Sequence, residues 1–586
     1  MHRTIHYYSI IIFLVFLTLV SCAKKKSCDP ENEEQCPSGS ICKKVGTDEG
    51  MCLDVCEQNV ADSCSASEVC IRYADNTYAC TPNCDPESTN ECPDDWLCAP
   101  VASSEHVCRP ECDLDSDTCD EGEVCQPLSD ETAVCTPECD PLGESDCGEN
   151  WVCELRTDGS YSCYEPVYFK GKVLDSSTED PIEGAHVIAV DKTGAAATDV
   201  AVTDADGIYE LQVPVVREPD GTPYEGIYTL RISASDYLPY PHGIRPAIPI
   251  EASLASYLEE GQWVLENAST EITLIAMPAE KQGQGSISGS IVVNSGDTSP
   301  GGVLVVVEGD TEEAPFSFGD KSGHYTVFNV PEGSWEVHGY KAFLQLDPVT
   351  VTSTTGEVKT GIDLISNSSS CGTVKGSLNI VNAPGGSMTS VVICPESTFN
   401  EDFVKGEVPP GLRAPAPPES PSITDSFTIE GVPDGRYVVL AAFENDSLVR
   451  DPDPSIAGTQ ILHIQVPDDS SYDIDIASSF KVTEALVIVS PGAIEPELIT
   501  ETPTFTWKDD SSETRYSIVV YNAFGDEVWR DNNLPRVTGS EDVAVNYDGD
   551  PLQTGMYYQF RVTSWKSGGP ISQTEDLLGV FYTSAD

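Results

Sequence analysis

Cysteine is the most regularly spaced reactive residue type in this chain, and its chemistry is disulfide formation or metal binding. Twenty of the 23 cysteines lie between residues 28 and 163 and follow the pattern C-x7-C-x5-C-x9-C, with three residues before the next unit. Five units begin at Cys28, Cys56, Cys84, Cys112 and Cys139, and the fourth is one residue shorter than the others. A fixed period of this size predicts an array of small structural units.

The spacing favours disulfides over zinc. Zinc ribbons and fingers use close C-x2-C pairs, whereas the shortest gap here is three residues. A unit of about 28 residues cannot bury enough apolar surface to fold unaided, and disulfides supply the missing stability. We therefore predict ten bridges within the array, with three pairings possible in each unit. The predicted cysteines are Cys28, Cys36, Cys42, Cys52, Cys56, Cys64, Cys70, Cys80, Cys84, Cys92, Cys98, Cys108, Cys112, Cys119, Cys125, Cys135, Cys139, Cys147, Cys153 and Cys163.

Two further cysteines are predicted to pair with each other. Cys371 and Cys394 flank a region rich in strand-forming residues, and the turn sequence Asn382-Ala383-Pro384-Gly385-Gly386 lies near the midpoint between them. A hairpin folded about that turn would place the two cysteines opposite each other. We expect a structural disulfide there rather than a metal or redox pair.

Cys22 remains without a partner, and its context predicts a lipid anchor. Residues 1–22 contain Arg3, an apolar run from about Tyr7 to Val20, and the ending Leu19-Val20-Ser21-Cys22. This is typical of a secretory signal, and the ending resembles the lipobox of bacterial lipoproteins. The resemblance implies acyl chains on Cys22 that hold the protein on a membrane, outside the cytoplasm, at the outer membrane or cell surface. The alternative is an ordinary secretory peptide in which Cys22 is incidental.

The sequence offers no recognisable catalytic site. The eight histidines form neither His-x-x-Glu nor His-Glu-x-x-His, and no Gly-x-Ser-x-Gly, phosphate-binding loop or dinucleotide fingerprint is present. We therefore predict that the protein is not an enzyme and has no catalytic residues and no cofactor. The histidines are His2, His6, His106, His186, His242, His324, His338 and His463.

Calcium is the one ion that the acidic residues could accommodate. Asp113-Leu114-Asp115-Ser116-Asp117 places carboxylates at alternate positions, and Asp204-Ala205-Asp206-Gly207 is similarly suggestive. The first run is followed by Thr118 where a calcium loop has glycine, and Asp and Gly are ordinary hairpin-turn residues. We favour the turn interpretation at both places and predict no metal site.

The charge of the chain restricts its partners. Lys and Arg number 31 against 97 Asp and Glu, which gives a formal net charge of −66. The array between residues 28 and 163 holds only five bases, Lys43, Lys44, Arg72, Arg109 and Arg156. Charge of this sign disfavours nucleic acid and anionic lipid as partners. An unknown protein or polysaccharide is the partner class that remains.

From Val167 onward the sequence predicts β-sandwiches. Short runs rich in Val, Ile, Tyr and Thr alternate with Gly, Pro, Asp and Ser, and residues 251–266 are the best helical candidate. The overall prediction is a mainly β chain, with the disulfide-rich array followed by about four sandwiches. The predicted boundaries are 1–22 for the signal peptide, 28–163 for the array, and 167–278, 285–366, 371–482 and 484–586 for the sandwiches.

The first three sandwiches are predicted to be copies of one design. Each opens with a strand centred on glycine, as in Phe169-Lys170-Gly171-Lys172-Val173 and Ile287-Ser288-Gly289-Ser290-Ile291, and Val374-Lys375-Gly376-Ser377-Leu378 is the third. Residues 167–278, with Pro181-Ile182-Glu183-Gly184-Ala185 and Thr203-Asp204-Ala205-Asp206-Gly207-Ile208-Tyr209, resemble a carboxypeptidase regulatory-like domain. The resemblance implies a prealbumin-like β-sandwich grouped with carbohydrate-binding-like folds. The second and third copies share the hairpin motif but lack a clean Thr-Asp-x-x-Gly.

The last segment differs from these three copies. The run Leu552-Gln553-Thr554-Gly555-Met556-Tyr557-Tyr558 is similar to the tyrosine-corner region of fibronectin type III domains. The resemblance implies another β-sandwich over residues 484–586.

We therefore expect a non-enzymatic cell-envelope lipoprotein, in which a disulfide-rich stalk presents β-sandwich modules for adhesion, recognition or envelope architecture. A first alternative is a carbohydrate-binding surface protein, in which exposed aromatics would stack on sugars. A second is an accessory protein of a protease or polysaccharide-degrading system, suggested by the family resemblance alone. The candidate stacking residues, each equally at home in a core, are Trp335, Tyr340, Trp529 and Trp565.

Overall fold

The computed structural model is built almost entirely of β-strands, as predicted, and divides into two compact units. One unit holds residues 1–164 and 218–221, and the other holds 165–217 and 222–586. The structure describes residues 27–29, 36–44, 50–57, 63–86, 92–102, 105–114, 119–129, 132–141, 147, 151–245, 247–258, 262–294, 298–309, 314–381, 389–400, 406–416, 419, 422–443, 461–477, 480–483, 485–537, 542–567, 569–574 and 578–583. Within these residues, no helix has the length and apolar character needed to cross a membrane.

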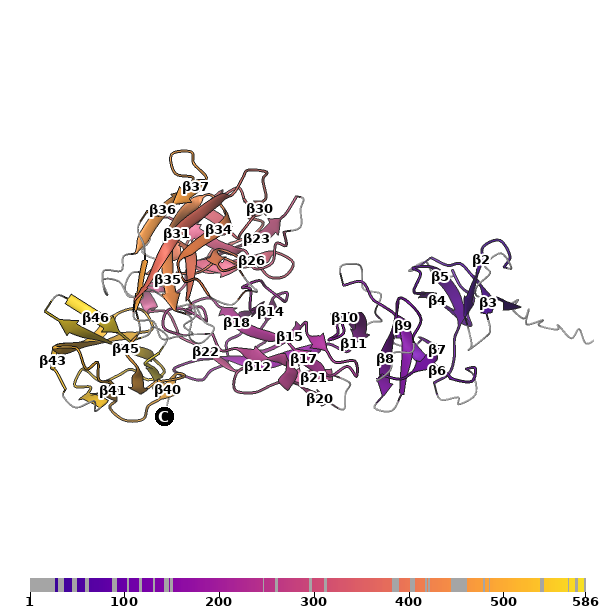
Figure 1. Cartoon of the computed structure of the whole chain (residues 1–586), viewed down its shortest axis with the longest axis horizontal. Helices are drawn as coiled ribbons and strands as arrows, with labels where there is room; N and C mark the ends of the chain where they lie inside the picture. The colour runs from indigo at the N-terminus through magenta and orange to yellow at the C-terminus, as the bar shows by residue number, and fades with distance from the viewer. Residues whose placement is uncertain are drawn as a thin grey trace, which may run out of the picture. The chain divides into compact units, whose positions relative to one another are not determined.

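Each cysteine repeat folds as one antiparallel hairpin. The third and fourth cysteines of a repeat face each other across its two strands, as Cys42 faces Cys52 and Cys98 faces Cys108. A short strand, β1 (Ser27–Cys28), adds to the first hairpin. The hairpins are β2 (Ser40–Lys44) with β3 (Gly50–Asp54), β4 (Glu68–Arg72) with β5 (Tyr78–Pro82), β6 (Trp96–Ala102) with β7 (Glu105–Cys112), β8 (Glu123–Ser129) with β9 (Thr132–Pro137), and β10 (Val152–Leu155) with β11 (Tyr161–Tyr164) (Figure 1).

Consecutive repeats are joined by backbone pairing as well as by the chain. Val55 pairs with Ala79, and Asn83 pairs with Val107 one repeat later. Glu111 pairs with Val134 in the next step. The residue before the fourth cysteine is fully buried in these three repeats, at Ala79, Val107 and Val134. This recurring pairing gives adjacent repeats a shared, if small, apolar contact.

The first sandwich consists of two sheets that enclose one apolar core. A small hairpin of β16 (Val216–Arg217) and β17 (Pro223–Glu225) lies outside the two sheets. One sheet contains β15 (Ile208–Val213), β12 (Val167–Asp175), β21 (Gln262–Leu265), β20 (Ser256–Leu258) and β22 (Ile272–Leu274). The other contains β14 (Ala201–Val202), β13 (His186–Asp191), β18 (Ile227–Ser233) and β19 (Ile250–Glu251).

Residues 251–266, the best helical candidate in the sequence, form no α-helix where the structure describes them. A 3-10 turn, η2 (Ala252–Leu254), is followed there by the β20–β21 hairpin. The residues of β20 are exposed, and its strand lies at the edge of the sheet. Sheet pairing with β21 therefore outweighs the weak helical periodicity of this segment.

The second and third sandwiches repeat this strand order. A 3-10 turn, η3 (Ala279–Lys281), precedes the second sandwich, and η4 (Glu396–Thr398) follows a strand of the third. The second contains β26 (His324–Val330), β23 (Gly285–Val292), β29 (Val358–Lys359) and β30 (Leu364–Ile365), opposite β25 (Phe316–Phe318), β24 (Leu304–Glu308), β27 (Gly333–Tyr340) and β28 (Val349–Ser353). The third contains β34 (Ser426–Val432), β31 (Gly372–Val381), β37 (Asp473–Asp475) and β38 (Phe480–Thr483), opposite β33 (Arg413–Ala414), β32 (Thr389–Pro395), β35 (Gly435–Phe443) and β36 (Leu462–Val466).

The central glycine of each opening strand has a structural reason. The last two strands of a sandwich run parallel to its first strand, and the chain between them passes over that glycine. A Cβ at Gly171 would overlap the carbonyl oxygen of Thr270, and one at Gly289 would overlap that of Ile362. At Gly376 it would meet the ring of Phe427. The repeated glycine therefore allows close passage of the backbone.

The three sandwiches pack on one another through strands that are apolar on both faces. In β13, Val187 and Ala189 face the core of the first sandwich, while Ile188 and Val190 join a second cluster. That cluster also takes in Leu304 of β24 and the core of the third sandwich. Strands buried on two faces have near-continuous apolar sequences, and this is the pattern of both strands.

The C-terminal sandwich has a different strand order. Its core includes Phe505 and Trp507, and Ile244 and Ile275 of the first sandwich pack against it. The Tyr558 hydroxyl accepts a hydrogen bond from the Gln553 amide at 2.7 Å. Its sheets are β39 (Ile488–Ser490), β41 (Thr504–Lys508) and β44 (Asp542–Asn546), and β40 (Glu497–Leu498), β47 (Val580–Tyr582), β45 (Tyr557–Lys566), β42 (Arg515–Asn522), β43 (Glu527–Pro535) and β46 (Gly569–Gln573) (Figure 1).

Candidate functional site

All twenty cysteines of the array form disulfides, and every repeat uses the same pairing. The first cysteine bonds to the third and the second bonds to the fourth, so both bridges connect the segment before the hairpin to the hairpin itself. Cα–Cα distances of 5.4–6.0 Å are ordinary for disulfides. The pairs are Cys28–Cys42, Cys36–Cys52, Cys56–Cys70, Cys64–Cys80, Cys84–Cys98, Cys92–Cys108, Cys112–Cys125, Cys119–Cys135, Cys139–Cys153 and Cys147–Cys163.

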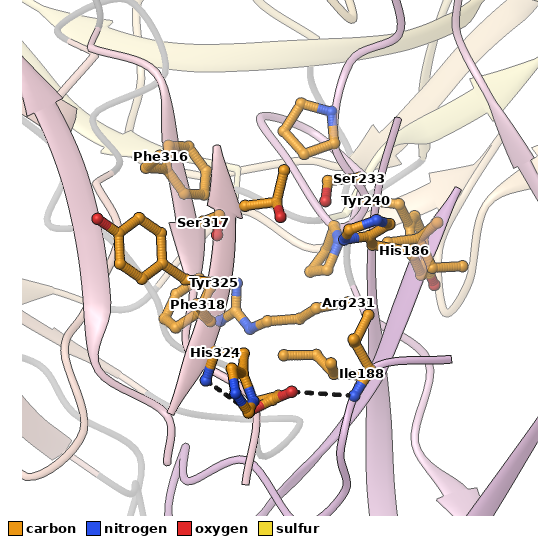
Figure 2. Close-up of a pocket in the computed structure, with 16 residues that line it drawn as sticks. His186, Ile188, Arg231, Ser233, Tyr240, Phe316, Ser317, Phe318, His324 and Tyr325 are labelled. Carbon is orange, nitrogen blue, oxygen red and sulfur yellow. Dashed lines mark hydrogen bonds and ion pairs between the residues drawn. The ribbon is translucent and has the colours of Figure 1, made fainter. Parts of the chain in front are cut away.

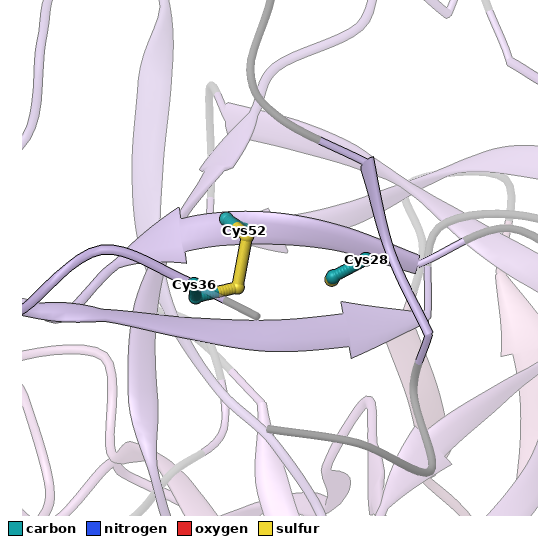
Figure 3. A group of neighbouring side chains, drawn as sticks. All are labelled: Cys28, Cys36 and Cys52. Carbon is teal, nitrogen blue, oxygen red and sulfur yellow. A yellow bond between two sulfur atoms is a disulfide. The ribbon is translucent and has the colours of Figure 1, made fainter. Parts of the chain in front are cut away.

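The two bridges of a repeat lie side by side. Figure 3 shows the Cys36–Cys52 bond with the sulfur-bearing side chain of Cys28 next to it. The sulfur atoms of these three residues lie within 4.8 Å of one another, and the other four repeats have equivalent triplets. Among the described residues these triplets are the only close groups of metal-ligating side chains. Every sulfur in these triplets is already in a disulfide: Cys36 is bonded to Cys52, and Cys28 is bonded to Cys42 outside the triplet. The triplets therefore offer no thiolate to a metal.

The predicted bridge between Cys371 and Cys394 is wrong. Both cysteines are free thiols. Cys371 directly precedes β31 and Cys394 lies in β32, and these two strands belong to opposite sheets of the third sandwich. β31 pairs with β34, and β32 pairs with β35, so the two never form a hairpin. The prediction assumed that strands adjacent in sequence pair with each other, whereas this fold sends its second strand to the other sheet.

Neither thiol is set up as a nucleophile. Cys394 is fully buried, and its Sγ donates to the Val438 carbonyl at 3.7 Å. Burial raises the pKa of Cys394 far above its usual value. Burial, with a smaller contribution from Asp434, also raises the pKa of Cys371. A thiol whose pKa is raised is a poor source of thiolate.

The predicted lipidation site, Cys22, and the signal peptide of residues 1–22 lie outside the described residues. The same holds for Asp115 and Asp117 of the first calcium candidate, and for His2 and His6.

The second calcium candidate is a hairpin turn. The Asp204 side chain accepts hydrogen bonds from the amides of Asp206 and Ile208 at 3.0 and 2.9 Å, and Gly207 has a positive φ of 72°. Backbone amides thus occupy one oxygen of the carboxylate, as expected for a turn.

The second sandwich contains the same turn, although its sequence lacks the threonine of the Thr-Asp-x-x-Gly pattern and the turn was not predicted there. Asp320 accepts from the His324 amide at 2.8 Å, and Gly323 has a φ of 88°. The shared signal is Asp-x-x-Gly-x-Tyr, ending at Tyr209 in the first sandwich and Tyr325 in the second. Their hydroxyls donate to the carbonyls of Thr270 and Ile362, respectively.

Two of the four predicted stacking aromatics are core residues. Trp335 is 5% exposed and Tyr340 is 2% exposed, and the Tyr340 hydroxyl donates to Glu308 at 2.7 Å. Trp529 and Trp565 are half-buried in the C-terminal sandwich. Their indole nitrogens donate to Asp548 and Ser517, respectively. More exposed rings occur elsewhere: Tyr224 is 56% exposed, and Tyr257 is 54% exposed beside Trp263, with ring centroids 5.2 Å apart.

A small pocket of about 80 Å³ lies between the first and second sandwiches. Figure 2 shows Arg231 extending toward Phe318, with His324 close by, and the Arg231 guanidinium lies 3.8 Å from the centre of the Phe318 ring. Arg231 also forms an ion pair with Glu407 at 3.0 Å. At this size the pocket suits a few water molecules rather than an organic ligand.

Asp320 holds this interface together. Its side chain is almost fully buried and accepts from the Val200 amide of the first sandwich at 3.3 Å. The same turn donates its Lys321 amide to the Thr198 carbonyl at 2.8 Å. Burial lowers the pKa of the nearby His186, an effect that Asp320 partly offsets. The pocket is thus a domain contact fixed by hydrogen bonds to the Asp320 carboxylate and from the Lys321 amide.

Comparison with protein families finds one match. The family of the N-terminal immunoglobulin domain of Rha78A-like proteins matches residues 493–578. The match covers most of the sandwich for which the sequence suggested a fibronectin type III relationship, and this segment is thus similar to an immunoglobulin domain. A search of curated proteins finds no match.

Solved structures give distant similarities to the Bacillus anthracis TIE protein and to two pilins. The Bacillus anthracis TIE protein is 10% identical, with 80% of this chain and 76% of that chain covered and a TM-score of 0.13. The major pilin subunit BcpA of Bacillus cereus is 10% identical, with 54% and 99% covered and a TM-score of 0.15. The shaft pilin SpaA from Lactobacillus rhamnosus GG is 8% identical, with 35% and 97% covered and a TM-score of 0.15. Similarities at these TM-scores carry no functional argument.

Proposed function

We propose that this chain is a non-enzymatic surface protein that works outside the cytoplasm, held at the cell envelope through acyl chains on Cys22. Its array would follow the anchor directly in sequence, and its sandwiches would serve adhesion, recognition or envelope architecture. The observation that carries the proposal is the uniform pairing of ten disulfides in five repeats. Structural disulfides in this number persist in oxidising compartments and are rare in the cytosol.

The packing of the sandwiches supports a scaffold role. β13 and β24 bury apolar side chains on both faces, and this joins the first three sandwiches through one continuous apolar cluster. Interfaces of this kind resist relative domain motion. A rigid scaffold suits the presentation of binding surfaces better than a catalytic cycle that needs closure.

A comparison of the chain with its Cys22→Ala variant tests the anchor. Wild-type protein should fractionate with membranes and incorporate radiolabelled palmitate, and the variant should be released without label. Retention of the variant on membranes, or wild-type protein without label, would contradict lipid anchoring. Recovery of the protein from the cytosol with free array cysteines would overturn the whole proposal.

A second candidate function is carbohydrate binding by the first sandwich. The exposed Tyr257 beside Trp263 offers an aromatic surface at the edge strand β20, and aromatic rings are common platforms for sugars. On a neutral glycan array, saturable binding that disappears in Tyr257→Ala and persists in Trp335→Phe would favour this function. Binding that survives Tyr257→Ala would remove this surface as its site.

A further inference from the structure

The cysteine array contains a groove that disulfide scaffolding does not require. Its volume is about 520 Å³, which is the size of pockets that hold drug-sized ligands or a few side chains of a peptide. Four consecutive repeats contribute to it. Its apolar and cationic lining comes mainly from Lys43, Met51, Ile71, Tyr73, Trp96 and Arg109.

A buried arginine is the distinctive feature of the groove. Arg109 is 6% exposed, and its Nε has no hydrogen-bond partner among the described residues. Its guanidinium lies 5.9 Å from the centre of the Tyr73 ring, and Lys43 lies 5.0 Å from the same centre. Burial lowers the pKa of Arg109, and nearby Glu123 partly offsets the effect. A buried guanidinium with an unsatisfied donor is costly unless a ligand completes it.

The repeats themselves provide an internal control for this residue. Arg109 directly follows the fourth cysteine of its repeat, where the second and fourth repeats have Thr81 and Thr136. The fold of a repeat therefore needs only threonine at this position. At the position of Trp96, two residues before the third cysteine, the same two repeats have Glu68 and Glu123, and the fifth repeat has Trp151. Arg109 is therefore the feature of the groove that no other repeat shares, since it is the only basic residue that directly follows a fourth cysteine.

The composition of the groove is that of a protein-binding hot spot. Tryptophan, tyrosine, arginine and methionine are the residue types enriched at protein interfaces and their energetic centres. Asp75 is paired with Lys43, while Asp120, Glu121 and Glu123 add negative charge to the lining. A fully anionic ligand would therefore be repelled. A segment of mixed charge fits: one carboxylate for Arg109, an apolar side chain for Trp96 and Tyr73, and a basic residue for the acids.

We propose that this groove binds a peptide segment of a partner protein, with a carboxylate of that segment on the guanidinium of Arg109. The planar fork of arginine matches a carboxylate in two parallel hydrogen bonds, a geometry that lysine cannot reproduce. The array is then a recognition element as well as a disulfide scaffold. This inference does not depend on lipid anchoring at Cys22.

The test is selection from a random heptapeptide phage library on the purified, oxidised full-length mature chain. We expect wild-type protein to enrich peptides with Asp or Glu next to an apolar residue and with a basic residue nearby. The binding of a selected synthetic peptide, measured by calorimetry, should weaken by about tenfold or more in Arg109→Thr. A second peptide, in which the selected glutamate is replaced by glutamine or the selected aspartate by asparagine, should bind wild-type protein with a similar loss of affinity. Arg109→Lys should recover only part of the affinity.

Two controls keep the test decisive. Arg109→Thr should keep its disulfides and melting temperature because threonine occupies this position in two other repeats. If Arg109→Thr is destabilised, Trp96→Glu serves as a second variant, since glutamate occupies that position in the same two repeats. Arg536→Thr, at an exposed site of the C-terminal sandwich, should leave binding unchanged. Enrichment without an acidic residue, or binding insensitive to Arg109→Thr, would overturn the proposal. Failure to enrich any peptide would do the same, as would Arg109-dependent binding confined to uronic-acid glycans.

Discussion

At the scale of single residues, one glycine and one tyrosine in each of the first two sandwiches fix where the last segment of that sandwich crosses its first strand. Gly171 leaves room for the Thr270 carbonyl, and the Tyr209 hydroxyl donates to that same oxygen at 2.7 Å. Gly289 and Tyr325 repeat the arrangement with Ile362. The third sandwich keeps the glycine and has Phe427 in place of the tyrosine, so the ring packs without the hydrogen bond.

Gly289→Ala should severely destabilise the second sandwich because the new methyl group would overlap the Ile362 carbonyl. We expect a loss of more than about 3 kcal/mol, as in other overpacked sites. Gly361→Ala is the matched control, since a methyl group added there would have no atom within 4 Å and only its positive φ of 72° is strained. Its cost should be near 1–2 kcal/mol, roughly the strain of one left-handed residue. Thermal unfolding followed by circular dichroism compares the two, and equal losses would contradict the crossing argument.

Tyr209→Phe should cost about 1 kcal/mol, the usual net value of one buried hydrogen bond. The expected signal is a lower urea midpoint for the first sandwich, with no change in its strand content. Tyr224→Phe, at a tyrosine that is 56% exposed, serves as the control and should be neutral. An unchanged midpoint in Tyr209→Phe would mean that the hydroxyl contributes nothing at the crossing.

Asp175 should make the first sandwich sensitive to acid. Burial raises the pKa of this carboxyl, but hydrogen bonds from Ser177, Thr178 and Tyr237 outweigh it, so the net pKa is lowered. The resulting stability is complete above the ordinary aspartate value of about 3.9 and is lost as the pH falls through the lowered value. Asp175→Asn should therefore melt below wild type at about pH 7, and the difference should shrink at about pH 2. A gap between the two melting temperatures that stays constant with pH would contradict this assignment.

At the scale of elements, the hairpin is the unit of the array and the two-sheet sandwich is the unit of the rest. The cysteine spacing was sufficient to predict the repeats and their disulfides, because a short unit with four cysteines has few other ways to fold. The spacing could not choose the pairing: Cys42 and Cys52 face each other across a hairpin, yet each bonds to a cysteine in the segment that precedes it. The position of that segment decides the pairing, and spacing alone does not encode it.

The same limit explains the error at Cys371 and Cys394. The sequence indicates strands at both places, but it does not indicate that consecutive strands enter different sheets. The groove of the array was missed for a related reason. Its lining comes from four repeats, and only the pairing between repeats brings Lys43, Tyr73 and Arg109 together. The one available signal was that Arg109 is the only basic residue directly after a fourth cysteine in the five repeats.

Removing one disulfide should loosen the repeat that contains it. The double variant Cys84→Ser/Cys98→Ser opens a bridge with a sequence separation of 14 residues, for which the usual loss is about 2–4 kcal/mol. Limited proteolysis should then cut within the third repeat, residues 84–108. Cleavage confined to other parts of the chain would show that backbone pairing between repeats holds the unit without the bridge.

At the scale of the whole molecule, two kinds of stabilisation divide the chain. The array relies on ten covalent bridges, and the first three sandwiches rely on apolar faces shared between domains. Ile188 and Leu304 belong to the shared cluster, whereas Val187 and Val305 face the cores of their own sandwiches. We therefore expect reduction to destabilise the array, and substitutions in the shared apolar cluster to affect the contact between sandwiches.

Leu304→Asp should separate the sandwiches without unfolding the second one. A charge in the shared cluster is costly to bury and is relieved when the domains part. We expect faster proteolysis between sandwiches and an increased radius of gyration in solution scattering, with strand content retained. The conservative Leu304→Ile variant controls for the position. An unchanged radius would contradict the view that this cluster joins the sandwiches.

The most direct test is disulfide mapping by mass spectrometry of the protein purified from its native source without reduction. We expect ten bridges, first to third and second to fourth cysteine in every repeat, with Cys371 and Cys394 recovered as thiols. We also expect an acylated N-terminal peptide beginning at Cys22. Free or differently paired cysteines between residues 28 and 163 would contradict the structure of the array and, with it, the extracytoplasmic function proposed for the chain.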